Sequence, residues 1–182
     1  MNLRLLFLRL GLPGFIKKQK LKELFGITAQ AFGCDPPDLT GLSGSGLLER
    51  YARFTKEQAQ KALIGGADVS AIRDRLFKGA ADLGSKIGRG LHLRSRREIL
   101  TASRYLYKML GIQFRGTDQG RVIITRCFFS AYYSAEVCRL ISSLDEGAAF
   151  GLSGGGVLRF ETRLTEGAAC CRGELEFKAD SE

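Results

Sequence analysis

The residues best suited to chemistry are four cysteines in the last third of the chain: Cys127, Cys138, Cys170 and Cys171. A thiolate can act as a nucleophile or as a metal ligand, and a neighbouring cation favours it by lowering the thiol pKa. Three arginines adjoin these cysteines in the sequence, namely Arg126, Arg139 and Arg172. The pattern therefore supports the hypothesis of a reactive thiol.

The same cysteines have two other interpretations. Free cysteine is among the most buried residue types, so these side chains could be packed and inert. Thiolate zinc sites usually contain two cysteines only a few residues apart, whereas the spacings here are eleven, thirty-two and one. No metal is therefore expected, and the reactive and the packed interpretation both stay open.

Other groups for acid, base or metal chemistry are few. Glu161, Glu166 and Glu174 are the carboxylates of the same region that could transfer a proton. His92 is the only histidine, and it lies in a basic segment that favours a solvated side chain. A site with several histidine ligands is thus excluded, and a Ser-His-Asp or Cys-His pair would depend on His92 alone.

The elements that must position these residues read as two hairpins around a helix. β-Branched and aromatic residues predict strands over 112–115 and 121–128, and alternation predicts two more over 157–164 and 170–177. Between the hairpins, residues 134–150 have the apolar spacing of a helix. The order predicts an antiparallel sheet of about four strands with one inserted helix.

Alternation also predicts which side chains of the second hairpin are buried. It places Arg163 on the solvent face together with Arg159 and Glu161. Cys171 shares a face of the last strand with its apolar residues, while Cys170 shares the other face with its charged residues.

Helices are expected before the sheet. A helical part over 47–111 follows a connector over 34–46 that is rich in proline and glycine. Asp68 and Ser95 are expected helix caps, and Thr55 could mark a break in the first of these helices. The prediction is a single α+β domain, 1–182, whose N-terminal helices pack on a C-terminal sheet of 112–177.

Residues 1–33 form a basic amphipathic helical start. Leucine and phenylalanine alternate there with Lys17, Lys18, Lys20 and Lys22. The segment is too charged to span a bilayer, which takes roughly 20 mostly apolar residues, and no cleavage-site pattern follows it. The favoured role is docking of its apolar side on the core, and peripheral membrane contact through 1–32 is the alternative.

The totals fit a globular protein with its own core, since 45% of the 182 residues are hydrophobic and 26% are charged. A net charge of +9 suits an anionic partner. Nucleic acid is not expected, because no nucleic-acid motif accompanies that charge. An odd count of 5 cysteines, two of them adjacent, indicates reduced thiols and a cytoplasmic protein. The oligomeric state is left open.

Several residues of the tail resemble a known family. They are Cys127-Phe-Phe, Tyr132-Tyr-Ser-Ala-Glu-Val-Cys138, Leu144-Asp145, Gly151-Leu-Ser-Gly154, Phe160 and Glu166-Gly-Ala-Ala-Cys170-Cys171. This tail is similar to the L-2-amino-thiazoline-4-carboxylic acid hydrolases, which open a thiazoline ring to N-carbamoyl-cysteine. More distantly, the order of helices and then sheet resembles the vinyl-reductase type of small-molecule-binding domain.

The first resemblance implies a hydrolase, without a cofactor, that opens the C=N bond of a ring bearing a carboxylate. The candidate catalytic residues are then Cys127, Cys138, Cys170 and Glu166. The candidate substrate-binding residues are Arg126, Arg172, Tyr132 and Glu161. The second resemblance implies a binding or sensor module with a similar pocket and no turnover.

Overall fold

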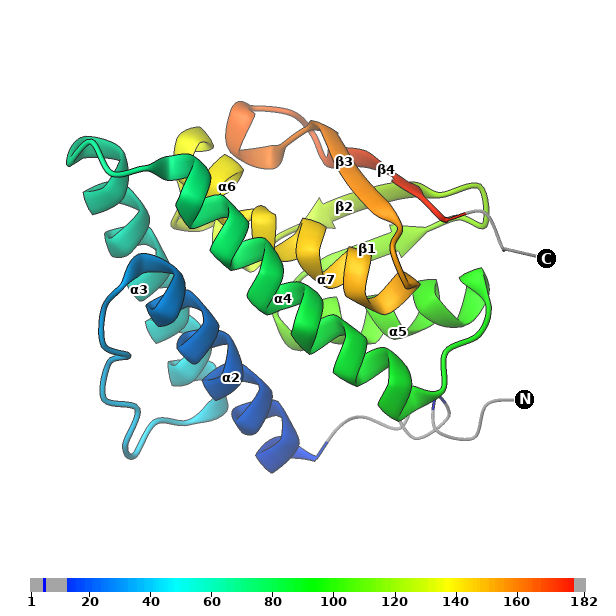
Figure 1. Ribbon diagram of the computed structural model, residues 1–182, viewed down its shortest axis with the longest axis horizontal. Coiled ribbons are helices and arrows are strands. Elements are labelled where there is room, and N and C mark those ends of the chain that lie inside the picture. The colour runs from blue at the N-terminus through cyan, green and yellow to red at the C-terminus, as the bar shows by residue number, and fades with distance from the viewer. Residues whose placement is uncertain (1–4, 6–12, 179–182) are drawn as a thin grey trace.

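The computed structural model describes Leu5 and residues 13–178, and helices come before strands in it (Figure 1). The first elements are α2 (Gly14–Phe32), α3 (Gly44–Ile64), α4 (Val69–Leu91) and α5 (Arg96–Met109). They are followed by β1 (Gln113–Gly116), β2 (Arg121–Arg126), α6 (Ala135–Ile141), α7 (Ser143–Ser153), β3 (Val157–Thr162) and β4 (Cys171–Glu176). The predicted α+β class is confirmed.

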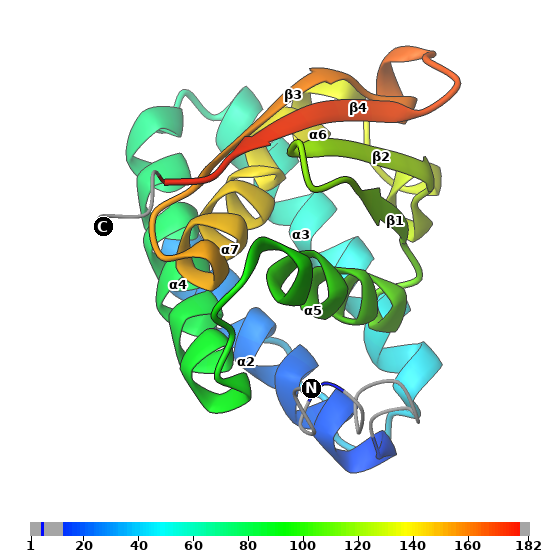
Figure 2. The same ribbon diagram turned by 90° about the vertical axis from the view of Figure 1, so that its right-hand side faces the viewer.

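The sheet has four strands in the order β1-β2-β4-β3, and every neighbouring pair is antiparallel. Burial alternates along β2 and β4, so one face of the sheet is packed and the other is wet. Helices α5 and α7 lie against the packed face, under β1 and β3 respectively (Figure 2). The predicted four-stranded sheet with helices on one side is therefore correct.

The prediction of a single inserted helix over 134–150 was wrong in one respect, because the structure has two helices there. Ser134 caps α6 as expected by accepting a hydrogen bond from the Val137 N–H. The helix then ends at Ser142, whose hydroxyl donates to the Arg139 carbonyl at 3.0 Å, and α7 begins at Ser143. A pair of serines is a common place for such a break, and here the Ser142 hydroxyl competes for a backbone carbonyl.

The first helix of the helical part begins earlier than expected and has no break. Ser43 caps α3 within the predicted connector, so the helix starts at Gly44. Thr55 does not interrupt it, because its hydroxyl donates to the Tyr51 carbonyl of the same helix at 2.8 Å. Asp68 and the capping box of Ser95 are confirmed.

Helix α2 buries Leu21 and Phe25 against the core and contacts α3 and α4. Docking of the apolar side of 13–32 on the core is therefore confirmed. Of the earlier residues the structure describes only Leu5, which packs with Ala102 of α5, and the remainder of the predicted amphipathic start lies outside the described residues. Among the described helices, none has the length and apolar character needed to cross a bilayer.

Strand β3 ends in a bulge that changes the direction of the residues after it. The register of β3 on β4 shifts between Phe160 and Thr162. Beyond this shift the chain enters a short 3-10 helix, Leu164–Glu166. A bulge adds one residue to a strand and so inverts the alternation that follows it. Arg163, predicted to face solvent, consequently lines the interior.

Candidate functional site

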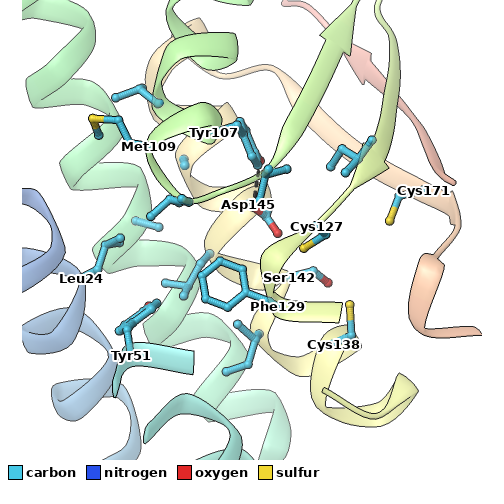
Figure 3. A pocket seen from close by; sticks show the side chains of 18 of the residues that line it. Leu24, Tyr51, Tyr107, Met109, Cys127, Phe129, Cys138, Ser142, Asp145 and Cys171 are labelled. Carbon is cyan, nitrogen blue, oxygen red and sulfur yellow. Dashed lines mark hydrogen bonds between the residues drawn. The ribbon is translucent and has the colours of Figure 1, made fainter. Parts of the chain in front are cut away.

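A cavity of about 180 Å³ lies between the helices and the packed face of the sheet (Figure 3). Most of its wall is apolar and comes from every layer of the fold: Leu21, Leu24, Leu83, Leu106, Met109, Ile112, Ile124, Phe129, Leu144, Leu152 and Phe160. A cavity of about 150 Å³ with such a lining holds one benzene molecule. The space therefore suits a molecule of about one ring with short substituents.

A buried carboxyl and a phenol interrupt this apolar wall. Asp145 of α7 faces the cavity and accepts a hydrogen bond of 2.8 Å from the Tyr107 hydroxyl of α5 (Figure 3). Tyr107 is held in turn by stacking on Phe114 of β1, with ring centroids 4.9 Å apart. Helix and strand packing thus fix both partners of the pair.

The surroundings of Asp145 favour its neutral form. Burial raises the pKa of its carboxyl to about 6, the hydrogen bond from Tyr107 lowers it, and the neighbouring charge of Glu146 raises it. The positive charge of Arg163 lowers it as well. A carboxyl with a pKa in this range holds a proton in part of the molecules near neutral pH.

Arg163 supplies positive charge to the cavity wall beside Asp145. Its guanidinium donates to the Ser142 hydroxyl at 3.3 Å and lies 5.1 Å from the Phe160 ring centroid. Within residues 13–178 no carboxylate lies within ion-pair distance of it. Its remaining N–H donors are therefore available to an anion in the cavity.

Three thiols also line the cavity, and they belong to Cys127, Cys138 and Cys171 (Figure 3). Burial raises the pKa of Cys127 to about 12. Burial raises the pKa of Cys138 and of Cys171 too, although the positive charge of Arg163 opposes both shifts. The expectation that adjacent arginines lower these pKa values is wrong, because the arginines next to these cysteines in sequence point elsewhere.

The predicted site residues are only partly brought together. Cys127 and Cys138 reach the cavity as expected, but Cys170 does not, and its neighbour Cys171 occupies that place. Glu166 is also outside and forms an ion pair of 2.8 Å with Arg139.

The four predicted substrate-binding residues lie outside the cavity as well. Arg172 and Glu161 are exposed on the wet parity of their strands, and Arg126 is exposed at the end of β2, where the alternation of burial stops. Tyr132 is half-buried on the far side of Phe128, and the guanidinium of Arg53 lies 5.8 Å from its ring centroid.

Three of the polar residues that face the cavity were missed as site residues: Tyr107, Asp145 and Arg163. Asp145 carried one signal, since it and Glu146 are the two charged residues of the helical run 140–152. Tyr107 and Arg163 carried none, because their directions depend on helix packing and on the bulge in β3.

Neither a family model nor a curated protein matches this chain. Among the described residues, histidine, cysteine and carboxylate side chains do not gather in groups of three or more that could hold a metal ion. The geometry of the cavity is therefore the basis for its interpretation.

Proposed function

We propose that the protein binds a small, mostly apolar molecule that carries one carboxylate. The observation that supports this most is the apolar cavity whose wall includes Arg163 and the hydrogen-bonded Asp145 and Tyr107. Ligand pockets are typically apolar with a few convergent polar groups that fix orientation. Such a pocket favours recognition by shape, with one charged contact.

In this proposal Arg163 binds the carboxylate, the role that the sequence suggested for Arg126 or Arg172. A guanidinium binds a carboxylate through two parallel hydrogen bonds, and this geometry is selective for planar anions. The Tyr107 and Asp145 side chains would then contact the substituents next to the carboxylate. The volume of about 180 Å³ limits the remainder to roughly one ring.

Binding without turnover is favoured by the state of the thiols. With a pKa of about 12, only roughly one Cys127 side chain in 100,000 is ionised at pH 7. Thiol chemistry requires the thiolate. A packed, uncharged role in the wall is the simpler account of these cysteines.

Hydrolysis of a ring that carries a carboxylate is the second candidate, and Asp145 is the residue that favours it. A carboxyl with a pKa of about 6 can both give and take a proton near neutral pH, as general acid–base catalysis requires. In that case Asp145 would take a proton from water that attacks the C=N carbon and pass it to the ring nitrogen. The ring C–S bond would then break, and the proton of the new hydroxyl would go to the leaving sulfur.

Titration calorimetry with benzoate and with benzyl alcohol tests the first proposal. Both have a ring of the right size, but only benzoate carries the anion that Arg163 would bind. Arg163→Gln should weaken benzoate binding roughly ten- to hundredfold, which corresponds to the ~1.5–3 kcal/mol of a charge-assisted hydrogen bond. Arg159→Gln, on the exposed face of β3, is the matched control and should bind benzoate like the wild type.

Incubation with L-2-amino-thiazoline-4-carboxylate separates the two candidates. Ring opening that is lost in Asp145→Asn, and kept in Cys127→Ala, would establish the hydrolase and replace the binding proposal. Binding of this compound without product is the outcome expected of a binding module.

A further inference from the structure

The first turns of α2 carry a dense positive charge. Lys17, Lys18, Lys20 and Lys22 lie there, and from Gly14 up to Glu23 no acidic residue accompanies them. Lys18 and Lys22 are exposed on the outer side of the helix. Phe15, one turn before Lys18, has 70% of its surface exposed, an unusual exposure for an aromatic side chain.

This basic surface borders an entrance to the cavity. Lys17 and Lys20 line the cavity although both are partly exposed, so the cavity reaches the surface beside α2. Leu24 of α2 and Met109 of α5 lie near this end, across the cavity from Cys171 (Figure 3). Lys20 is held there by an ion pair of 2.8 Å with Glu23.

We propose that this surface, Phe15 with Lys18 and Lys22, binds an anionic lipid bilayer. Lysines next to a membrane are attracted to anionic headgroups, while an exposed aromatic ring inserts at the boundary of the acyl chains. The entrance beside Lys17 and Lys20 lies on the opposite side of the same helix, next to this contact.

A bilayer fits this surface better than nucleic acid does. Single-stranded nucleic acid is bound on several aromatic platforms along a basic groove. Among the described residues, Phe15 is the one exposed aromatic ring beside the lysines at this end of α2. An exposed ring at the end of a cationic helix is instead typical of an interfacial contact.

A tryptophan reporter tests the contact directly, since the chain has no tryptophan of its own. In Phe15→Trp, vesicles of phosphatidylglycerol should shift the emission to the blue, and vesicles of phosphatidylcholine should not. Ile64→Trp is the control, because Ile64 is 87% exposed and lies at the far end of α3 (Figure 1). An equal shift in both variants, or none in Phe15→Trp, overturns the proposal.

Charge reversal tests the role of the lysines in the full chain. Lys18→Glu with Lys22→Glu changes the net charge from +9 to +5 (9 − 4). Arg115→Glu with Arg172→Glu, on the wet face of the sheet, gives the same +5. Co-flotation with phosphatidylglycerol vesicles at low salt should fall at least tenfold in the first variant and little in the second.

Three results would contradict the lipid partner. They are an equal loss in both charge variants, binding that survives 1 M salt, at which the screening length is roughly 3 Å, and binding of a DNA or RNA oligonucleotide in preference to vesicles. Benzoate affinity measured without lipid distinguishes the two proposals, because the lysine variant should retain it. Loss of flotation with benzoate binding intact confirms the lysine contact, whereas a wild type that binds benzoate but not vesicles refutes only the membrane contact.

Discussion

Two sides of α7 are packed in opposite ways. On the side toward α4, a Cβ atom added to Gly147 would lie 2.2 Å from the Phe77 carbonyl oxygen, and one added to Gly151 would lie 2.1 Å from that of Ala81. The two helices are therefore in backbone contact. On the other side, Asp145 and Leu152 face a cavity. One helix thus has, on one side, an interface too close for an added methyl group and, on another, an open cavity.

The difference shows that the cavity is not a result of loose packing. Protein interiors are close-packed, and an empty space survives only where its walls cannot relax into it. The backbone contact of α7 with α4 fixes one wall, and the stacking of Tyr107 on Phe114 fixes another. Asp145 is consequently held in place at the cavity before any ligand arrives.

The largest effect is expected from filling the tight interface. Gly151→Ala should destabilise the protein by about 3 kcal/mol, since overpacking forces the two helices apart. Gly26→Ala is the matched control at an exposed position of α2, where nothing lies within 4 Å of the added Cβ, and it should stabilise by ~0.5–1 kcal/mol. Urea unfolding of both variants measures the contrast, and similar values for the two would show that the backbone contact is unimportant.

The next effect concerns the buried carboxyl. The folded-state pKa of Asp145, about 6, lies above its ordinary 3.8, so the folded protein binds more protons in that window and loses stability as the pH rises through it. Asp145→Asn removes this loss while its amide oxygen still accepts the hydrogen bond from Tyr107. Between pH 4 and pH 8 the variant should gain about 2–3 kcal/mol relative to the wild type.

Urea unfolding at the two pH values measures this difference. Glu146, whose pKa burial also raises, is present in both proteins and cancels. If the free energy of unfolding changes equally with pH in wild type and variant, the pKa of Asp145 in the folded protein is that of an exposed carboxyl.

A smaller effect is expected on ligand affinity. Benzoate stays ionised between pH 6 and pH 8, because carboxyl groups ordinarily titrate near pH ~4. An ionised Asp145 beside it is unfavourable, so affinity should rise as the pH falls toward 6, by at most about tenfold per unit. Benzyl alcohol should show no such trend, nor should benzoate with Asp145→Asn. A pH-independent benzoate affinity of the wild type would place the anion away from Asp145.

The smallest effect compares two neighbours on α6. Val137 is fully buried in packed core, and Val137→Ala should destabilise by about 2 kcal/mol. Cys138 lines the cavity, and Cys138→Ala should change stability by less than ~1 kcal/mol, because its sulfur already lacks contacts on one side. If Cys138→Ala lowers the stability more than Val137→Ala does in thermal unfolding, the Cys138 sulfur is packed on all sides and does not border a cavity.

The sequence was sufficient for the elements whose signals are local. The capping box of Ser95 and Glu98 depends on residues three apart, and the parity of Cys170 and Cys171 depends on simple alternation. Two predictions, the single helix over 134–150 and the solvent-facing Arg163, failed because the local pattern is overridden. The Ser142 and Ser143 pair divides a continuous helical pattern, and the bulge after Phe160 inverts a continuous strand pattern.

The candidate site was less predictable than the fold for the same reason. The cavity is formed by side chains from helices α2, α4, α5 and α7 and from the sheet, and no sequence spacing encodes how far apart those elements stand. Arg163 was assigned to solvent by an alternation that its own strand does not keep. Cys170 and Arg172 were chosen for their chemical type alone. Cys170 lies just before β4 and Arg172 within it, and both alternate with the exposed residues of that strand.

A crystal structure with 4-bromobenzoate tests the proposed function most directly. The account predicts anomalous scattering from bromine inside the cavity among the apolar side chains, with the carboxylate within hydrogen-bond distance of the Arg163 guanidinium. The Arg163→Gln crystal, soaked in the same way, should show much weaker bromine density. Bromine found only on the surface, with the cavity of the wild type empty, would contradict the proposal that this cavity binds a carboxylate.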